Sequence, residues 1–203
     1  MSPMTDVSDV NNEQKREALR SVLQLARRQL DKAQVEEYSD TIAETLLTHL
    51  EPAAKVAGYL ALGNEVKLDS VLHAARRQQC QTYVPIVQAE NTMVFSPISD
   101  DTPLVKNQYG ILEPKLTLNE CIPASELDVV LVPLVGFDEQ CQRMGMGGGY
   151  YDRAFAHKRE DTEAKPVLIG VAYEVQCTRS VLADWWDVPL DRVVTEKRTI
   201  HRP

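Results

Sequence analysis

Apolar side chains recur every three or four residues through the first fifty positions of the chain. The first set is Ala18, Leu19, Val22, Leu23, Ala26 and Leu30, and the second is Val35, Tyr38, Ile42, Leu46 and Leu50. This spacing places each set on one face of an α-helix, so the pattern predicts two successive amphipathic helices. Asp31 with Gln34 forms a capping-box pattern at the start of the second helix. The polar residues 1 to about 10 are expected to be loose.

Short and nearly continuous apolar runs follow, and each is typical of a buried strand. They cover residues 55–62, 82–87, 92–96, 127–135, 166–172 and 191–195. The run 127–135 is apolar along almost its whole length, as a strand covered on both faces is. Pro85 is awkward in a central strand because it lacks a backbone N–H. Helices are expected in between, one capped by Asp69 and ending at Arg77, and one beginning near Tyr150.

Alternation of strands with helices predicts an α/β protein. We expect one domain over residues 1–203, with a layered α/β/α architecture and a mostly parallel central sheet flanked by helices. The chain has no internal repeat, low-complexity tract or linker that would divide it. Residues 97–126 contain several prolines and little periodicity, so they are predicted to form a long irregular surface segment whose role the sequence leaves open.

The charge of the chain limits its partners. A formal net charge of -8 argues against an extended nucleic-acid surface, which needs a basic field over many phosphates. Basic residues are concentrated near the N-terminus, where the sequence has Lys15, Arg16, Arg20, Arg27, Arg28 and Lys32. A local basic patch on an acidic protein suits a small anionic ligand.

Compartment and metal chemistry can also be narrowed from the sequence. No apolar run reaches the roughly 18 residues of a membrane span, and the N-terminus lacks a signal-peptide pattern, so no membrane association and a cytoplasmic location are expected. The four cysteines and four histidines lack the spacing of a disulfide framework or a transition-metal site. The cysteines are predicted to be reduced thiols.

A glycine-rich loop, Gly145-Met146-Gly147-Gly148-Gly149, lies between the strongest predicted strand and a predicted helix. In open α/β folds ligands bind beyond the carboxyl ends of the strands, and a glycine-rich loop before a helix offers backbone N–H groups to phosphate. The loop matches neither the P-loop nor the Gly-x-Gly-x-x-Gly pattern. A turn that needs glycine only for its geometry is the alternative, but the flanking Arg143 and Asp152 favour phosphate binding.

Asp152 falls in the first turn of the predicted helix. Its carboxylate can complement the helix dipole there, or it can bind Mg²⁺ that bridges phosphate oxygens. Because Mg²⁺ usually takes only one or two protein carboxylates, Asp152 and Asp191 would suffice, although the sequence does not establish that they meet.

The segment Val132-Pro133-Leu134-Val135-Gly136-Phe137-Asp138, followed by residues 143–152, closely resembles the 5-formyltetrahydrofolate cyclo-ligase family, also called 5,10-methenyltetrahydrofolate synthetases. The resemblance extends to Lys15-Arg16-Glu17-Ala18-Leu19-Arg20, to residues 59–66 with Glu65, to Glu113-Pro114-Lys115 and to residues 186–195. These blocks span nearly the whole chain.

The resemblance implies a ligase that forms a C–N bond in a ring. It would close 5-formyltetrahydrofolate to 5,10-methenyltetrahydrofolate with ATP and Mg²⁺, releasing ADP and phosphate through a phosphorylated formyl group, an imidate phosphate. Phosphoryl transfer depends on positioning and charge neutralisation, so no protein nucleophile is required. The implied partners are ATP and the folate, and the protein is expected to be a monomer or a weak homo-oligomer.

Site residues follow from the resemblance. Those implied to bind ATP are Arg16, Arg20, Arg143, Met144, Gly145, Met146, Gly147, Gly148, Gly149, Tyr150 and Tyr151. Those implied to bind the folate are Leu60, Glu65, Met146, Gly147, Gly148, Gly149 and Tyr150. Arg143 and Tyr151 are implied to be catalytic, and Asp152 with Asp191 to hold Mg²⁺. One departure is that some relatives have a basic residue inside the glycine loop, where this chain has Met146 and Gly148.

Other interpretations remain open at this point. Arg16 and Arg20 could form a solvated helical stripe, Leu60 and the two tyrosines could be core residues, and Lys15 could replace Arg16 in the family pattern. A sugar-phosphate isomerase of similar fold would need no ATP, and a noncatalytic folate- or nucleotide-binding module would need no aligned metal ion.

Overall fold

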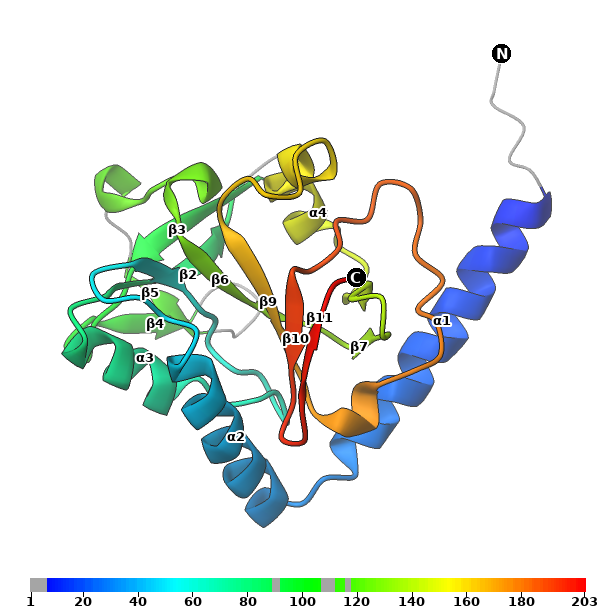
Figure 1. Ribbon diagram of the computed structural model, residues 1–203, viewed down its shortest axis with the longest axis horizontal. Coiled ribbons are helices and arrows are strands. Elements are labelled where there is room, and N and C mark those ends of the chain that lie inside the picture. Colours follow the sequence, from blue (N-terminus) through cyan, green and yellow to red (C-terminus); the bar gives the residue numbers. More distant parts are fainter. Residues whose placement is uncertain (1–6, 89–91, 107–111, 116–117) are drawn as a thin grey trace.

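A seven-stranded, mostly parallel sheet with helices against it forms the body of the protein, as the sequence predicts (Figure 1). The computed structural model describes residues 7–88, 92–106, 112–115 and 118–203. Its strand order is β11-β10-β9-β6-β1-β2-β3, in which the five central strands from β10 to β2 run parallel and the two edge strands antiparallel.

The elements have the following bounds. The sheet consists of β1 (Lys55–Ala57), β2 (Gln81–Val87), β3 (Met93–Pro97), β6 (Val129–Pro133), β9 (Val167–Val171), β10 (Arg192–Val194) and β11 (Thr199–His201). The α-helices are α1 (Val7–Arg28), α2 (Lys32–Leu47), α3 (Asp69–Arg77) and α4 (Tyr150–Ala154). Two small antiparallel pairs are β4 (Leu104–Lys106) with β5 (Leu112–Pro114), and β7 (Gly136–Phe137) with β8 (Arg143–Met144).

Strand β6 shows why the sequence of a central strand is a continuous apolar run. Its Val129 and Leu131 belong to the core on one face of the sheet, while Val130 and Val132 belong to the core on the other. Successive side chains of a strand point to opposite faces, so a strand covered twice needs apolar residues at every position. The buried double layer fixes β6 between β1 and β9.

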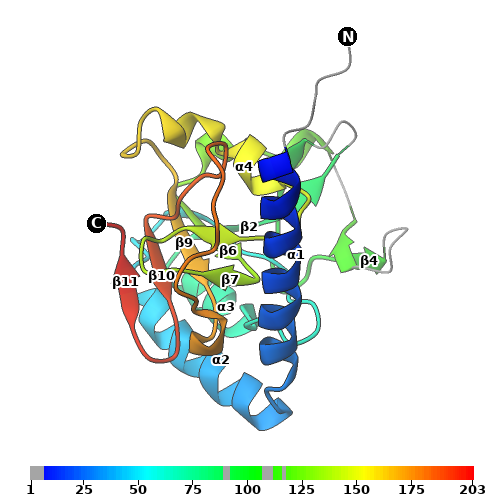
Figure 2. The same cartoon turned by 90° about the vertical axis from the view of Figure 1, so that its right-hand side faces the viewer.

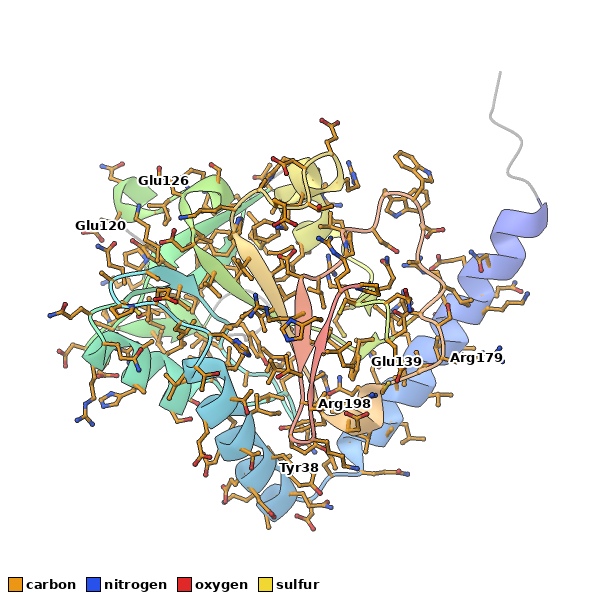
Figure 3. All side chains as sticks on the ribbon, in the orientation of Figure 1. Tyr38, Glu120, Glu126, Glu139, Arg179 and Arg198 are labelled. Atoms are coloured by element: carbon orange, nitrogen blue, oxygen red, sulfur yellow. The ribbon has the colours of Figure 1, made fainter. Side chains whose placement is uncertain are left out.

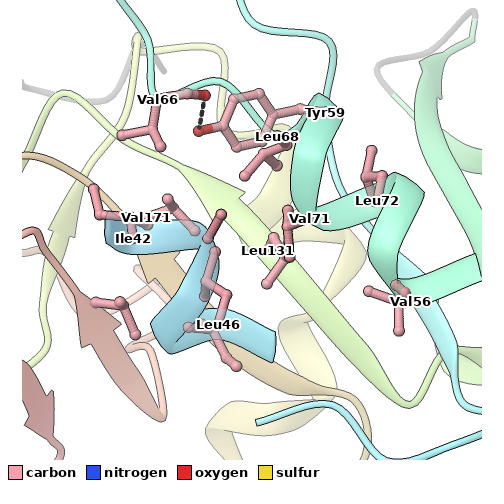
Figure 4. Packing of buried hydrophobic residues seen from close by; sticks show 14 of the residues in the cluster. Ile42, Leu46, Val56, Tyr59, Val66, Leu68, Val71, Leu72, Leu131 and Val171 are labelled. Atoms are coloured by element: carbon pink, nitrogen blue, oxygen red, sulfur yellow. Dashed lines mark hydrogen bonds between the residues drawn. The ribbon is translucent and has the colours of Figure 1, made fainter. Parts of the chain in front are cut away.

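Helices α2 and α3 cover the first face. Ile42 and Leu46 from α2 and Val71 from α3 pack with Leu131 in one buried cluster (Figure 4). In the same cluster the Tyr59 hydroxyl donates a 3.1 Å hydrogen bond to the Val66 carbonyl, which satisfies the one polar atom of this buried ring (Figure 4). The second face is covered by α4, the 3₁₀ helix Ala156–Arg159 and the segments around Phe137 and Leu190.

Helix α1 lies along one flank of the molecule (Figures 1 and 2). Its Leu23 forms a small buried cluster with Val135, Met144 and Val181, next to the β7–β8 hairpin. A Cβ atom at Gly136 would lie 2.3 Å from Leu23 Cδ1, so the hairpin backbone and the helix are in close contact. Ala18 and Val22, predicted on the apolar face, are exposed instead.

Several predicted element ends are confirmed and others are wrong. The capping box is present, because the Asp31 carboxylate accepts from the Gln34 N–H and the Gln34 side chain accepts from Asp31. Asp69 is not a cap: it is the first residue of α3, and Leu68 precedes it without a side-chain cap. Strand β1 ends at Ala57, five residues before the predicted end, since the chain turns away after it.

Two predictions of irregular structure need correction. Helix α1 begins at Val7, so residues 7–10 are helical rather than loose, and residues 1–6 lie outside the described residues. The segment 97–126 contains the β4–β5 pair and the 3₁₀ helices Leu118–Glu120 and Ala124–Glu126. Three-residue strands carry too few positions for a period of two to be visible in the sequence.

Pro85 is accommodated because of where its neighbours end. Strand β1 stops at Ala57, opposite Tyr83, so no ladder bond to β1 is lost at Pro85. On the other side Pro85 lies opposite Phe95, whose carbonyl accepts the Ile122 N–H at 2.9 Å and so needs no donor from β2. Proline is tolerated at a position where the neighbouring strands require no donor.

The C-terminal strand β11 was not predicted. It pairs antiparallel with β10 and forms the outer edge of the sheet. At the turn between them, Arg198 reaches Glu139 at 3.1 Å and Glu174 at 2.8 Å, and these ion pairs tie the hairpin to the body of the protein (Figure 3).

Two further expectations can be compared with the structure. All four cysteines are free thiols, as predicted, and Cys80 and Cys141 are buried. Burial raises the pKa of Cys141 to about 11, so this thiol is unreactive at neutral pH. Across the part of the chain that the structure describes, no helix combines the length and the apolar character needed to cross a membrane.

We expect Leu131→Ala to lower the free energy of unfolding by about 3 kcal/mol, because Leu131 is fully buried in the central strand and its truncation leaves a cavity. Leu25→Ala, on the 55% exposed Leu25 of α1, is the matched control and should change stability by less than about 0.5 kcal/mol. Urea unfolding measures both variants. Equal effects would contradict the assignment of β6 to the core.

Candidate active site

A cavity of about 1260 Å³ opens beyond the carboxyl ends of β1 and β6. From β1 the chain continues to β2 on one side, whereas β6 lies on the other side of β1, so the strand order reverses between them. Open α/β sheets bind their ligands at such a switch point. Pro133 and Leu134 at the end of β6, and Glu65 after β1, line the cavity.

The glycine loop forms one wall of this cavity. It connects β8 to α4, and all five of its residues are in the lining. Gly147 has a φ of +97° and Gly149, directly before α4, a φ of +63°, which are conformations that side chains disfavour. A Cβ at Gly148 would lie 2.6 Å from the Tyr150 ring. Geometry alone therefore demands glycine at three positions, and it also brings the loop backbone to the cavity surface.

Arg143 and Asp152 are joined across the base of this loop. An Arg143 guanidinium nitrogen lies 2.6 Å from Asp152 Oδ1, and their side chains are only 5% and 15% exposed. The same oxygen accepts the Val188 N–H at 3.0 Å. Arg143 also lies over the Tyr151 ring, 5.7 Å from its centroid. The ion pair thus connects β8, α4 and the segment before β10.

Arg20 reaches the glycine loop from α1. Its Nε donates to the Gly145 carbonyl at 3.1 Å, and its terminal nitrogens lie near Gly147. Arg20 lines the cavity, so a guanidinium is held at the wall formed by the loop. This hydrogen bond brings helix α1 into contact with the glycine loop.

Arg16 is also in the lining, but its guanidinium points to carboxylates. It lies 2.6 Å from Asp184 and 3.0 Å from Asp187, and it donates to the Leu182 carbonyl at 2.9 Å. Its neighbour Lys15 is exposed and is not a lining residue. Of the two basic residues that the sequence left open, Arg16 is the one at the cavity.

Glu65 and Tyr151 lie in the lining as well. The Glu65 carboxylate accepts the Leu62 N–H at 3.0 Å and lies 3.4 Å from Arg27. Burial raises the pKa of Tyr151, and the charge of Glu65 adds to this while Arg143 opposes it. The Tyr151 phenol is therefore neutral near pH 7 and available as a hydrogen-bond donor.

Three predicted site residues lie outside the lining. Met144 is fully buried in the cluster with Leu23, and Leu60 is partly buried after β1. Asp191 is absent from the lining too, so the structure does not bring it to the cavity with Asp152. Its carboxylate lies 3.1 Å from the buried Lys158 and 3.4 Å from Arg202, and it accepts the Leu168 N–H.

Several lining residues were not predicted as site residues. The charged and aromatic ones are Glu13, Arg153, Arg159, Asp184, Trp186 and Asp187. Arg159 donates to the Trp186 carbonyl at 2.7 Å, and Arg153 lies over the Tyr150 ring, 5.2 Å from its centroid. Trp186 and Asp187 fall within a family block, but the sequence carried no signal that Asp184 and Asp187 face a helix more than 160 residues earlier.

The lining is electrically balanced. It contains five arginines and five carboxylates, so their formal charges cancel. Asp152 offers a carboxylate oxygen, a ligand that Mg²⁺ prefers, because both hydrogen bonds described for Asp152 use Oδ1 and not Oδ2, whereas Asp184 and Asp187 are engaged by Arg16. Among residues 7–88, 92–106, 112–115 and 118–203, no three His, Cys, Asp or Glu side chains are grouped so that they could hold a metal ion themselves. The donor set fits a magnesium ion that completes its shell with phosphate oxygens and water.

Together these features define the class: an α/β protein with its ligand cavity at the topological switch point of a mostly parallel sheet. The sequence model of the 5-formyltetrahydrofolate cyclo-ligase family matches residues 12–196. The chain therefore belongs to the 5-formyltetrahydrofolate cyclo-ligase family, and the predicted family and enzyme class, a ligase, are confirmed.

Individual relatives agree with this assignment. A 5-formyltetrahydrofolate cyclo-ligase of Haemophilus influenzae is 31% identical over 183 residues, which cover 88% of this chain and 96% of the relative. The solved structure of Aquifex aeolicus 5,10-methenyltetrahydrofolate synthetase has a TM-score of 0.77 at 28% identity and covers 92% of both chains. The Mycoplasma pneumoniae synthetase has a TM-score of 0.69 at 26% identity, with 89% of this chain and 98% of that one covered.

We expect Asp152→Ala to destabilise the protein by about 3 kcal/mol, because it leaves the buried Arg143 without its carboxylate. Glu160→Ala, at an exposed position just after the 3₁₀ helix Ala156–Arg159, is the control and should change stability by less than about 0.5 kcal/mol. Urea unfolding gives both values.

The double variant Arg143→Met/Asp152→Ala sharpens this test. It removes both charges, so we expect it to be more stable than Asp152→Ala alone. If the double variant loses as much stability as Asp152→Ala and Arg143→Met lose together as single variants, the pair is not the coupled unit that the 2.6 Å contact indicates.

Proposed function

We propose that the protein closes 5-formyltetrahydrofolate to 5,10-methenyltetrahydrofolate at this cavity, with ATP consumed and ADP and phosphate released, and with Mg²⁺ as a cofactor that accompanies the nucleotide. Membership of the cyclo-ligase family supports the folate conversion. The observation that carries the rest is the cavity itself, where the glycine loop, Arg20 and the Arg143–Asp152 pair face one space next to Glu65.

The size of the cavity supports two substrates. Sites for a single drug-sized ligand usually occupy about 300–1,000 Å³. At about 1260 Å³ this cavity exceeds that range, which suits a nucleotide and a folate bound side by side. A protein that only bound one of them would not require the additional space.

The chemistry of the lining suggests how the substrates divide it. Glu65, with its carboxylate fixed by the Leu62 N–H and Arg27, offers hydrogen-bond acceptors that suit the N–H groups of a pterin. The glycine loop and Arg20 offer donors and positive charge to a triphosphate. The formyl group would then lie between them, beside Arg143 and Tyr151.

In the first step of the proposed reaction, the formyl oxygen attacks the γ-phosphorus of ATP. A P–O bond forms as the bond to the leaving ADP oxygen breaks, which turns a poor leaving group into a phosphate ester. The folate N10 then attacks the formyl carbon and loses its proton. The C–O bond breaks, phosphate departs and the ring is closed.

Residues of the chain would assist this sequence by charge and hydrogen bonding. Arg143, held by Asp152, is assigned to the negative charge on the transferring phosphoryl group. The neutral Tyr151 hydroxyl is assigned as a donor to an oxygen of the reacting group. When bound, Mg²⁺ neutralises charge on the phosphate oxygens. Both hydrogen bonds described for Asp152 use Oδ1, so we assign Oδ2 to the metal.

Asp191 is the weaker of the two metal ligands implied by the resemblance, because its carboxylate already meets two cations. Membership of a ligase family favours this reaction over a sugar-phosphate isomerase or a noncatalytic binding module. We further propose a cytoplasmic location, since four free thiols suit a reducing compartment.

Purified protein incubated with 5-formyltetrahydrofolate, ATP and Mg²⁺ is expected to generate the near-ultraviolet absorbance of the methenyl product, with one ADP formed per product molecule. Omitting ATP, or chelating Mg²⁺, should abolish both signals. Asp152→Asn should keep most of its fold and lose most turnover, since the amide oxygen can still accept from Val188 but carries no charge. Product formation without ADP would exclude the phosphorylated intermediate.

Arg20→Gln is expected to raise KM for ATP about tenfold, because it removes a charged donor at the glycine loop. KM for the folate should change little. Arg28→Gln, at an exposed position two turns further along α1, is the control. Steady-state kinetics with each substrate varied in turn make the comparison, and an equal rise in both KM values would argue against a nucleotide role for Arg20.

A further inference from the structure

We infer that Met146, on the wall of the cavity, is an oxidation site, and that its conversion to the sulfoxide by a hydroperoxide lowers turnover. Met146 carries the only side chain of the glycine loop, because the other four residues of the loop are glycines. It lines the cavity and is 68% exposed. The effect on turnover rests on the proposed function, whereas the oxidation itself does not.

Accessibility distinguishes the Met146 sulfur from the other methionine sulfurs that the structure describes. Met144, two residues earlier in β8, is fully buried, and Met93 in β3 is 9% exposed. A thioether reacts with a peroxide when the two can meet, so a buried sulfur is protected. Met1 and Met4 lie outside the described residues. Of the described methionines, Met146 is therefore the one that an oxidant in solution can reach.

The thiols of the chain compete weakly for a peroxide at neutral pH. A peroxide attacks the thiolate and not the thiol. Burial raises the pKa of all four cysteines, and at Cys141 the pKa is raised to about 11. The thiols therefore stay protonated, whereas a thioether has no proton to lose before it reacts.

The contacts of the Met146 sulfur favour the oxidised form. The side-chain amide of Gln24 on α1 donates to Met146 Sδ at 3.2 Å, and Arg28 donates to the oxygen of the same amide at 3.4 Å. The Arg28 contact thus orients the amide with its N–H groups toward the sulfur. A thioether is only a weak acceptor, and oxidation makes the group polar. Gln24 would therefore hold the new oxygen in a stronger hydrogen bond.

The oxidation itself needs no catalytic group from the protein. A lone pair of the Met146 sulfur attacks the terminal oxygen of the hydroperoxide, and the S–O bond forms as the O–O bond breaks. The proton on the transferred oxygen moves to the departing oxygen, which leaves as water when the oxidant is hydrogen peroxide. Sulfur loses two electrons and the peroxide gains them.

The backbone of the loop is tethered on both sides of Met146. The Gly145 carbonyl accepts from Arg20 Nε at 3.1 Å, and the Gly148 carbonyl accepts from Arg153 at 2.6 Å. An added oxygen therefore remains at the cavity wall, because the loop cannot move away without losing these bonds. A flexible apolar side chain becomes a polar one where the substrates are proposed to bind.

Treatment with hydrogen peroxide tests the inference. Peptide mass spectrometry measures the sulfoxide at each of the five methionines over time, and the same samples are assayed for cyclo-ligase turnover. We expect Met146 to be oxidised about tenfold faster than Met93 or Met144, since rate follows exposure. Turnover should fall about tenfold as Met146 becomes oxidised, because small displacements in an active site have effects of this size or larger.

Met146→Leu removes the sulfur and keeps an apolar side chain of similar volume, and Met93→Leu is the matched control. Each variant is compared with its own untreated sample, so that any effect of the substitution on the basal rate cancels. Met146→Leu should keep its turnover through the treatment, whereas Met93→Leu should lose it as the parent protein does. Methionine sulfoxide reductases of both stereospecificities should restore the oxidised parent.

Three results would overturn the inference. They are slow oxidation of Met146 relative to the buried methionines, full turnover after Met146 is oxidised, and equal inactivation of Met146→Leu. If the untreated protein shows no turnover at all, the proposed function fails and the effect on turnover fails with it. The map of sulfoxides then still decides whether Met146 is the oxidation site.

Discussion

The buried ion pair between Arg143 and Asp152 is the interaction on which the cavity depends. It joins the end of the β7–β8 hairpin to the first turn of α4, so it determines where the glycine loop between them begins and ends. Through Val188 it also holds the segment that leads into β10. A five-residue helix has little stability of its own, and this contact gives α4 a fixed place on the sheet.

Charge balance explains much of the remaining arrangement. The cavity could attract a polyphosphate simply with excess positive charge, yet its arginines are matched by carboxylates. Arg16, Arg27 and Arg143 each face an acidic side chain, which keeps these buried cations stable without a ligand. The magnesium-bound triphosphate that we propose as the ligand carries less charge than the free nucleotide, which suits a balanced site.

Sequence reasoning predicted the parts of the fold that local patterns encode. The apolar run at β6, the capping box at Asp31 and the helix start at Tyr150 all depend on neighbouring residues, and all three are present. The β7–β8 and β10–β11 hairpins were missed because strands of two or three residues show no period. Strand β1 was overextended because the apolar residues 58–62 resemble a strand in composition, although Ala61 and Leu62 are exposed.

The site residues also divide into those that local motifs predict and those that only the folded topology brings together. The glycine loop, Arg20 and Glu65 lie in family motifs and line the cavity, whereas the partners of Arg16 are on a distant loop that no local pattern connects to α1. Long-range ion pairs of this kind depend on the folded topology. For the same reason the sequence could not show that Asp191 faces Lys158 and Arg202 rather than the cavity.

The contact between Arg16 and Asp187 spans 171 residues, so the first helix and the segment before β10 complete the same cavity. During synthesis the N-terminal helix leaves the ribosome long before its partner exists. The cavity can therefore be completed only when nearly the whole polypeptide has emerged, and a chain truncated before Asp184 would lack one side of the site. The pocket is therefore assembled late, after most of the chain has been synthesised, although Arg16 is among the first residues to be made.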